Sequence, residues 1–142
     1  MLGGCGGRRR SADALPDGLH EIAVGSATAV VRVARSPEER AGGLMGVERL
    51  GPDEGMLFLF PEAGRASFWM KDTNIALSIA FITSDGKIAE IQDMAPGSIE
   101  THTSQAAVRM ALEMPAGWFG RKGVSPGDAV RLPRALAGAP QR

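Results

Sequence analysis

The chain has 142 residues, 44% of them hydrophobic and 23% charged, which is enough for one domain with a hydrophobic core. Its 16 Lys and Arg residues balance 16 Asp and Glu residues, and this neutrality argues against nucleic-acid binding, which usually requires a basic excess. The sequence contains no run of about 18 apolar residues, so we expect no transmembrane span.

A single cysteine, Cys5, excludes an intramolecular disulfide and argues against a cysteine-based zinc site. Its surroundings, MLGGCGG, resemble the lipobox of bacterial lipoproteins, with Leu2, Gly4 and Cys5 in register, although the apolar segment expected before a lipobox is absent. Two interpretations stay open. The protein is exported to the cell envelope or periplasm with a lipid anchor at Cys5, or the match is accidental and the protein is cytoplasmic.

Composition divides the chain into three parts. Residues 1–17 are rich in Gly, Arg and Ser and are expected to form a flexible tail or tether. Residues 133–142 are rich in Pro, Ala and Gly and are expected to form a second flexible tail. Between them, residues 18–132 show no internal repeat and are expected to form a single β-rich domain.

The first predicted elements are two strands within residues 21–34, joined by a glycine-led hairpin turn. A helix of two or three turns follows, because Ser36 and Glu39 can form a capping box at its start. Leu44 and Met45, near the end of this segment, are the expected anchors of the helix to the core.

Further strands are indicated by short apolar runs and by period-two alternation of apolar residues. Residues 67–71 place Phe68 and Met70 on one face and Trp69 on the other, and residues 75–82 alternate more sharply. Pro115 can begin a second short helix, which carries two aromatic residues. The predicted strands of this part of the chain are 56–60, 67–71, 75–82, 87–94, 108–114 and 129–132.

These elements amount to about eight short strands and two short helices. No long helix is available for a parallel crossover. The predicted fold class is therefore mostly β (α+β), a compact antiparallel barrel or sandwich.

Glu113 stands out because it lies among apolar neighbours on the predicted strand 108–114. If that face is partly buried, its carboxylate needs a partner, and Arg40 or Arg109 could serve. We expect a structural ion pair here, with a catalytic acid as the alternative.

Familiar catalytic patterns are absent from the sequence, including a nucleophile elbow, a P-loop and a dinucleotide fingerprint, and we expect no cofactor. His20 and His102 lie far apart and belong to no ligand cluster, so we expect no metal site. His102 falls in the longest stretch without predicted structure, 95–106, where we expect an exposed loop histidine. A catalytic triad built on His102 is the alternative.

The segment SFWMKDTN, residues 67–74, admits two interpretations. It can be a strand and a turn, with Lys71 at the rim because burial of an unpaired ammonium group is costly. It can also be a small polar-ligand site, an aromatic floor bordered by an amine, a carboxylate, a hydroxyl and an amide. The candidate binding residues are Arg40, Met45, Trp69, Lys71, Asp72, Thr73, Asn74 and Glu113.

The order of the motifs is similar to that of a bacterial and archaeal family, domain of unknown function 192. The motifs are Arg40-x-x-x-Leu44-Met45, GMLFLF (55–60), FWMKDT (68–73), LSIAFI (77–82), ALEMPAG (111–117) and VSPGDAV (124–130). The resemblance covers about residues 22–132. It implies a small, mostly β protein that often follows a signal peptide, and it implies no reaction or ligand.

Two departures from the family pattern bear on function. The family usually has Pro-Leu-Asp where this chain has Ala76-Leu77-Ser78, and often a tyrosine where it has His102. If the missing acidic group were catalytic, this chain would be inactive. A binding or structural role depends less than a catalytic role on an acidic group at position 78.

Two functions therefore remain open. The preferred one is non-catalytic binding of a small polar ligand, glycan or cell-envelope partner near Trp69 and Lys71 by an exported protein. It requires Trp69 to lie at the base of a recess. The alternative is a small hydrolase or transferase that uses Glu113, Asp72 or His102.

Overall fold

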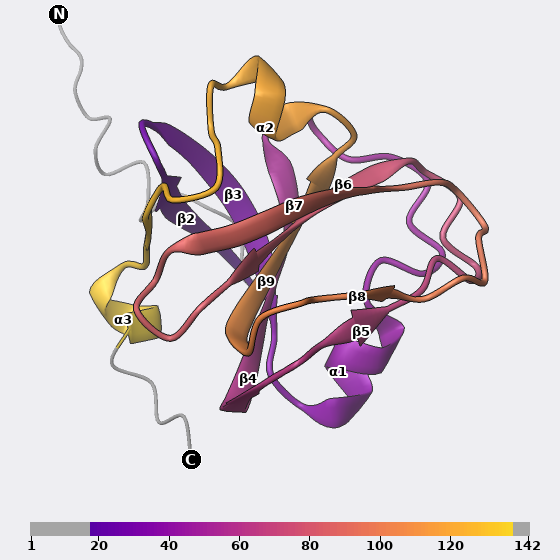
Figure 1. The fold of residues 1–142 in the computed structure, drawn as a ribbon. Helices are drawn as coiled ribbons and strands as arrows, with labels where there is room; N and C mark the ends of the chain where they lie inside the picture. The colour runs from indigo at the N-terminus through magenta and orange to yellow at the C-terminus, as the bar shows by residue number, and fades with distance from the viewer. Residues whose placement is uncertain (1–17, 138–142) are drawn as a thin grey trace, which may run out of the picture.

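The structure is a computed structural model that describes residues 18–137, so Cys5 and the proposed lipidation site lie outside the described residues. Within this range the fold is mostly β: a seven-stranded sheet curls into a half-barrel, accompanied by a two-stranded sheet and three short helices (Figure 1). This confirms the predicted fold class. The strands of the large sheet, in spatial order, are β10 (Val130–Arg131), β2 (Leu19–Val24), β3 (Ala27–Ala34), β4 (Glu54–Gly64), β9 (Val108–Pro115), β6 (Leu77–Ile82) and β7 (Ile88–Met94).

Neighbouring strands of the large sheet are antiparallel except for β3 and β4, which are parallel. The connection between these two strands contains the short helix α1 (Pro37–Gly42) and a long irregular segment, which together provide the length that a parallel crossover needs. The prediction of a wholly antiparallel sheet is therefore wrong at this one pair, because a crossover does not require a long helix.

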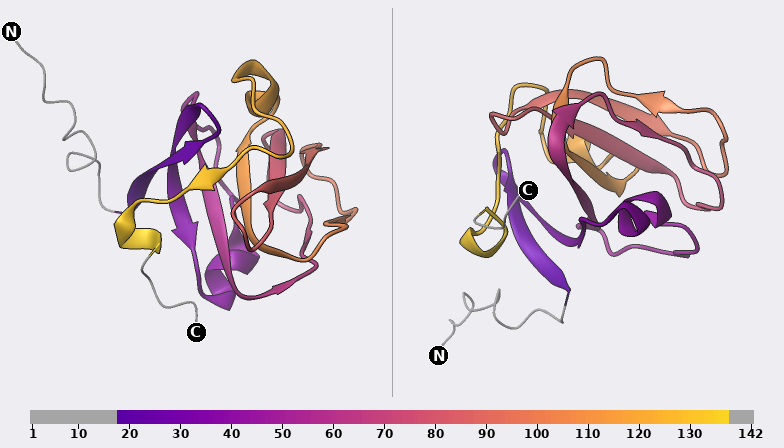
Figure 2. Two further views of the ribbon diagram at one scale, coloured as in Figure 1. Left: turned by 60° about the vertical axis from the view of Figure 1, so that its left-hand side comes forward. Right: turned by 90° about the horizontal axis from the view of Figure 1, so that it is seen from below.

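The large sheet curls so far that its two ends meet. Ile88, at the start of β7, donates a hydrogen bond to the carbonyl of Asp128 at 2.9 Å and accepts one from Gly127 at 2.8 Å. Val130, at the start of β10, donates to the carbonyl of Gly86 at 2.8 Å. Figure 2 shows the resulting curvature from two further sides.

Successive side chains of a strand point to opposite faces of the sheet. Each face carries its own cluster of buried hydrophobic side chains. The first hydrophobic cluster, here the Trp118 cluster, contains Leu57 and Leu112 together with Trp118. The second, here the Phe58 cluster, contains Phe58 and Ile79. The wholly apolar run 56–60 is thus explained by a strand buried on both sides.

Two of the three short helices were predicted from the sequence. The capping box of α1 is confirmed, since Ser36 Oγ accepts from the amide of Glu39 at 3.0 Å and Glu39 Oε1 accepts from the amide of Ser36 at 3.0 Å. The predicted second helix is α2 (Trp118–Arg121). A third helix, α3 (Arg134–Ala137), lies within the segment 133–142 that was expected to be a flexible tail. Leu136 of this helix is buried in the Trp118 cluster, which holds the helix against the domain.

The small sheet pairs β5 (Ser67–Phe68) with β8 (His102–Thr103), and it lies near α1 (Figure 1). The strand predicted over 67–71 ends early, at Phe68. Across residues 18–137, the helices are too short to cross a membrane.

Candidate functional site

A cavity of about 500 Å³ lies between α1, the loop that follows it, β4 and residues 67–73. This volume is within the range of about 300–1,000 Å³ that is typical of small-molecule sites. Its polar lining consists of Arg40, Ser67, Thr73, Thr101 and Glu113. Its apolar lining is larger and includes Leu44, Met45, Phe58, Phe60, Phe68, Trp69 and Met70.

Three phenylalanine rings form one wall of the cavity. Phe58 and Phe60 alternate on β4 and therefore share a face. The ring of Phe68 on β5 packs edge-on against both, with centroid distances of 4.9 Å to Phe58 and 6.3 Å to Phe60. Phe68 also lies 5.9 Å from the fully buried Phe81, so the wall is anchored in the Phe58 cluster.

Three segments beside the cavity are held together by main-chain hydrogen bonds. Gly46 donates to the carbonyl of Asp72 at 3.0 Å, Met70 donates to the carbonyl of Ser98 at 2.9 Å, and Gly97 donates to the carbonyl of Thr73 at 2.8 Å. These bonds join residues distant in the sequence and fix the three segments relative to one another.

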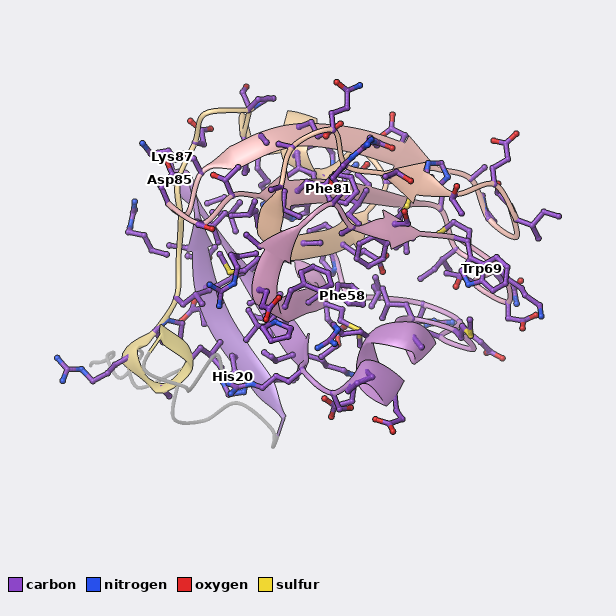
Figure 3. The ribbon with its side chains drawn as sticks, turned by 60° about the horizontal axis from the view of Figure 1, so that its bottom comes forward. His20, Phe58, Trp69, Phe81, Asp85 and Lys87 are labelled. Carbon is purple, nitrogen blue, oxygen red and sulfur yellow. The ribbon has the colours of Figure 1, made fainter. Side chains whose placement is uncertain are left out.

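Trp69 lines this cavity and is 46% exposed, so it is not enclosed in the core. Figure 3 shows it at one end of the molecule, while Phe58 and Phe81 lie nearer the middle. The Lys71 ammonium lies 5.5 Å from the centroid of the Trp69 ring, outside the lining of the cavity. The Lys71 amine therefore lies beside the indole without lining the cavity.

Glu113 is the buried ionisable residue of the cavity lining, with only 4% of its surface exposed, and Thr73 is a second buried polar residue there. On β9 it lies between Met56 of β4 and Ile79 of β6, both apolar. Burial raises the pKa of the Glu113 carboxyl from its ordinary value of 4.5 to about 8. The side chain is therefore mainly protonated at neutral pH.

The expected ion pair of Glu113 is absent from the described part of the chain, and that prediction is wrong. Arg40 instead donates through Nη1 to the carbonyls of Arg35 and Leu59, the second at 3.2 Å, and its guanidinium lies 5.5 Å from the centroid of the Phe60 ring. Arg109 donates through Nε to the carbonyl of Phe60 at 3.0 Å. Both arginines bind main-chain oxygens, so the buried carboxyl keeps no cation beside it.

The candidate binding residues are thus only partly brought together. Three residues of the 71–74 turn lie outside the cavity lining and are exposed, namely Lys71, Asp72 and Asn74. Asp72 has a positive φ of 59°, a conformation that Asp tolerates in turns, and the chain reverses there. The candidates that line the cavity are Arg40, Met45, Trp69, Thr73 and Glu113.

His102 differs from the expected exposed loop histidine. It lies on β8 opposite Phe68, is partly buried, and its Nε2 atom has no hydrogen-bond partner within residues 18–137. Of the three proposed catalytic residues, Glu113 lines the cavity and His102 and Asp72 do not. In the described ranges no group of three His, Cys, Asp or Glu side chains is arranged to hold a metal ion.

Ser78, the departure from the family pattern, lies on the other face of the sheet. Its partner on β9 is Met114 of the Trp118 cluster, whereas Ile79 is the partner of Glu113. Ser78 Oγ donates to Asp93 at 2.7 Å and accepts from the amide of Gly117 at 3.0 Å. The change to serine therefore does not touch the cavity.

The aromatic wall was missed by the sequence analysis, although a signal for it exists. The alternation of Phe58 and Phe60 in MLFLF places two rings on one face of a strand. Thr101 carries no comparable signal, because it lies in an irregular segment that only the folded chain brings to the cavity.

Comparisons with known proteins agree with this description. The sequence model of the family DUF192, described as "Uncharacterized ACR", matches residues 20–132. The structure is similar to that of a proposed transcription regulator from Sinorhizobium meliloti 1021, with 37% identity, a TM-score of 0.75, and 79% of this chain and 90% of that chain covered. It is also similar to a protein of unknown function from Novosphingobium aromaticivorans DSM 12444, with 32% identity, a TM-score of 0.76, and 80% and 84% covered. A search of curated proteins finds no match.

Proposed function

We propose that this chain, which belongs to the DUF192 family, is a non-catalytic binding protein that holds a small ligand in the cavity beside Trp69. One observation carries the proposal: the Glu113 carboxyl is buried in that cavity without a hydrogen bond or an ion pair among the described residues. A buried polar group without a partner costs free energy of folding. A ligand that binds the carboxyl would offset this cost.

The lining defines the kind of ligand. Four aromatic side chains together with Leu44 and Met70 make most of the wall apolar, and the polar groups are few. This pattern favours a small, largely apolar molecule with one polar end over a glycan, whose many hydroxyl groups would lose their hydrogen bonds to water.

Catalysis is not favoured by this arrangement. General acid–base chemistry needs a second positioned group or a nucleophile within hydrogen-bond reach of the reacting atoms. Glu113 is the one carboxyl in the lining, and neither Asp72 nor His102 joins it there.

The name of the Sinorhizobium relative suggests a second role for this family, in transcription. A direct contact with DNA requires several basic side chains to neutralise phosphates. The formal net charge of zero of this chain gives no such excess, so ligand binding is the better supported function.

Export is part of the proposal on sequence grounds alone, through the lipobox-like Leu2, Gly4 and Cys5. Growth of expressing cells with labelled palmitate tests it. Label that appears on the wild type and is lost in Cys5→Ser supports a lipid anchor, and a wild type without label overturns it.

The binding proposal is tested with a fluorescent apolar probe, N-phenyl-1-naphthylamine. We expect saturable 1:1 binding to the wild type and a loss of affinity of at least about tenfold in Trp69→Ala, because the indole forms part of the cavity wall. Ile99→Ala is the matched control, since Ile99 is 72% exposed and lies outside the lining. No saturable binding, or equal losses in the two variants, would overturn the proposal.

A further inference from the structure

The charged residues of the cavity lining narrow the class of ligand further. Glu113 is the acidic residue of the lining and Arg40 is the basic one, within the described part of the chain. The elements next to Glu113 in the sheet, β4 and β6, present Met56 and Ile79 to it. Among residues 18–137, no charged side chain therefore balances a carboxylate at this position.

Arg40 does not fill that role, because its guanidinium is held at the wall of the cavity. Its Nη1 atom bonds two main-chain carbonyls and its charge lies over the Phe60 ring. Burial alone accounts for the raised pKa of Glu113, with no contribution from a neighbouring cation. The two charges therefore act at separate parts of the cavity.

The aromatic lining suits a cation. The faces of Phe and Trp rings attract ammonium groups within about 6 Å of the ring centroid, most strongly where water is excluded. The lining contains Phe58, Phe60, Phe68 and Trp69. A carboxylate beside such rings is a common way to hold a buried ammonium group, because each charge offsets the desolvation of the other.

We propose that the ligand is a small organic amine with an apolar body, whose ammonium group forms an ion pair with Glu113 inside the aromatic cavity. This inference rests on the proposed function. Binding at neutral pH releases one proton: the ammonium ion enters, Glu113 loses its proton to solvent, and the two opposite charges meet.

The proton release sets the pH dependence of binding. Burial raises the pKa of Glu113 to about 8, so protons compete with the amine below that pH. The affinity should rise about tenfold from pH 6 to pH 7 and about fivefold from pH 7 to pH 8, and should level off above that. An anionic ligand that accepts a hydrogen bond from the protonated carboxyl would show the opposite trend, because it would lose affinity above pH 8.

The test uses three probes of matched size: phenethylamine, 2-phenylethanol and 3-phenylpropanoate. Isothermal titration calorimetry at pH 6, 7 and 8, in two buffers of different ionisation enthalpy, measures affinity and protons released. We expect phenethylamine to bind best at pH 8, with an affinity about 50-fold above that at pH 6 and a release of nearly one proton at pH 6. In Glu113→Gln, the preference for the amine and its pH dependence should vanish while 2-phenylethanol still binds.

The possible outcomes separate this inference from the proposed function. If the alcohol binds as well as the amine, without pH dependence, the amine inference fails and ligand binding stands. If 3-phenylpropanoate binds best, the amine inference fails in favour of an anionic ligand. If neither the three probes nor N-phenyl-1-naphthylamine binds, both the amine inference and the proposed ligand-binding function fail.

Discussion

Gly55 of β4 lies so close to the main chain of Glu113 on β9 that a Cβ atom at position 55 would overlap the Glu113 carbonyl oxygen. The same atom would overlap the sulfur of Met114. Only glycine fits at this contact, so the close approach of β4 and β9 beside Glu113 depends on a residue without a side chain.

The first prediction follows from this contact. Gly55→Ala should lower the free energy of unfolding by about 1–3 kcal/mol or more, as overpacking does in other cores. Urea denaturation measures the change. Gly64→Ala, on the same strand, is the matched control, because a Cβ atom there meets nothing within 4 Å. Equal effects of the two variants would contradict the tight contact.

The second prediction concerns stability and pH. The folded state holds the Glu113 proton up to about pH 8, whereas the unfolded chain releases it near 4.5, so the folded state binds more protons between these values. Stability should therefore fall as pH rises through this window, by an amount on the order of 4 kcal/mol between pH 5 and pH 8.

Glu113→Gln removes this contribution while it keeps the shape of the side chain. Relative to the wild type, the variant should gain stability as pH rises from 5 to 8 in urea denaturation. Asp53 does not interfere, because its hydrogen bond from the Trp118 indole lowers the pKa of its carboxyl and places its titration at more acid pH. A difference between the two proteins that does not change with pH would contradict the burial of an unpartnered carboxyl.

The third prediction concerns the serine that departs from the family pattern. Ser78 is 1% exposed and joins Asp93 to the amide of Gly117. Ser78→Ala should lower the free energy of unfolding by about 1–3 kcal/mol, since it removes two part-buried hydrogen bonds, one of them to the Asp93 carboxylate. Binding of N-phenyl-1-naphthylamine should be unchanged, because Ser78 and the cavity lie on opposite faces of the sheet.

Ser125→Ala is the control for this prediction, because Ser125 is exposed and, within residues 18–137, it forms hydrogen bonds through its main-chain amide and carbonyl and not through its hydroxyl. It should leave both stability and binding unchanged. A Ser78→Ala variant as stable as Ser125→Ala would show that the two hydrogen bonds contribute nothing.

The fourth prediction compares two polar residues of one segment. His102 keeps a buried Nε2 atom without a partner, whereas Ser104 Oγ accepts from the amide of Ala66 at 2.9 Å and donates to the carbonyl of Ala106 at 2.8 Å. His102→Leu should keep or raise the melting temperature, and Ser104→Ala should lower it. The reverse order would show that His102 has a structural partner.

Much of the fold could be predicted from local patterns. The capping box at Ser36 and Glu39 uses residues three apart, and the alternation in 75–82 indicates a strand without knowledge of its neighbours. The site could be predicted less well. The burial of Glu113 depends on two strands from distant parts of the sequence, which cover it with Met56 and Ile79.

The expected ion pair of Glu113 is wrong for the same reason: it depends on contacts between segments that are distant in the sequence. Arg40 and Arg109 are free to reach a carboxylate as far as the sequence shows, but in the fold both bind main-chain carbonyls near β4. The partner of a buried charge is decided by the arrangement of strands, which local patterns do not contain. The exposed turn at Asp72 was predicted because its polar residues need only local interactions.

The most direct test of the account is the titration of the Glu113 carboxyl itself. Carbon-13 NMR can follow the side-chain carboxyl signal, assigned by its absence from Glu113→Gln, with and without saturating phenethylamine. We expect a pKa of about 8 in the free protein and a pKa several units lower with the amine bound. A carboxyl that titrates near 4.5 in the free protein, or whose pKa does not respond to the amine, would contradict the central claim.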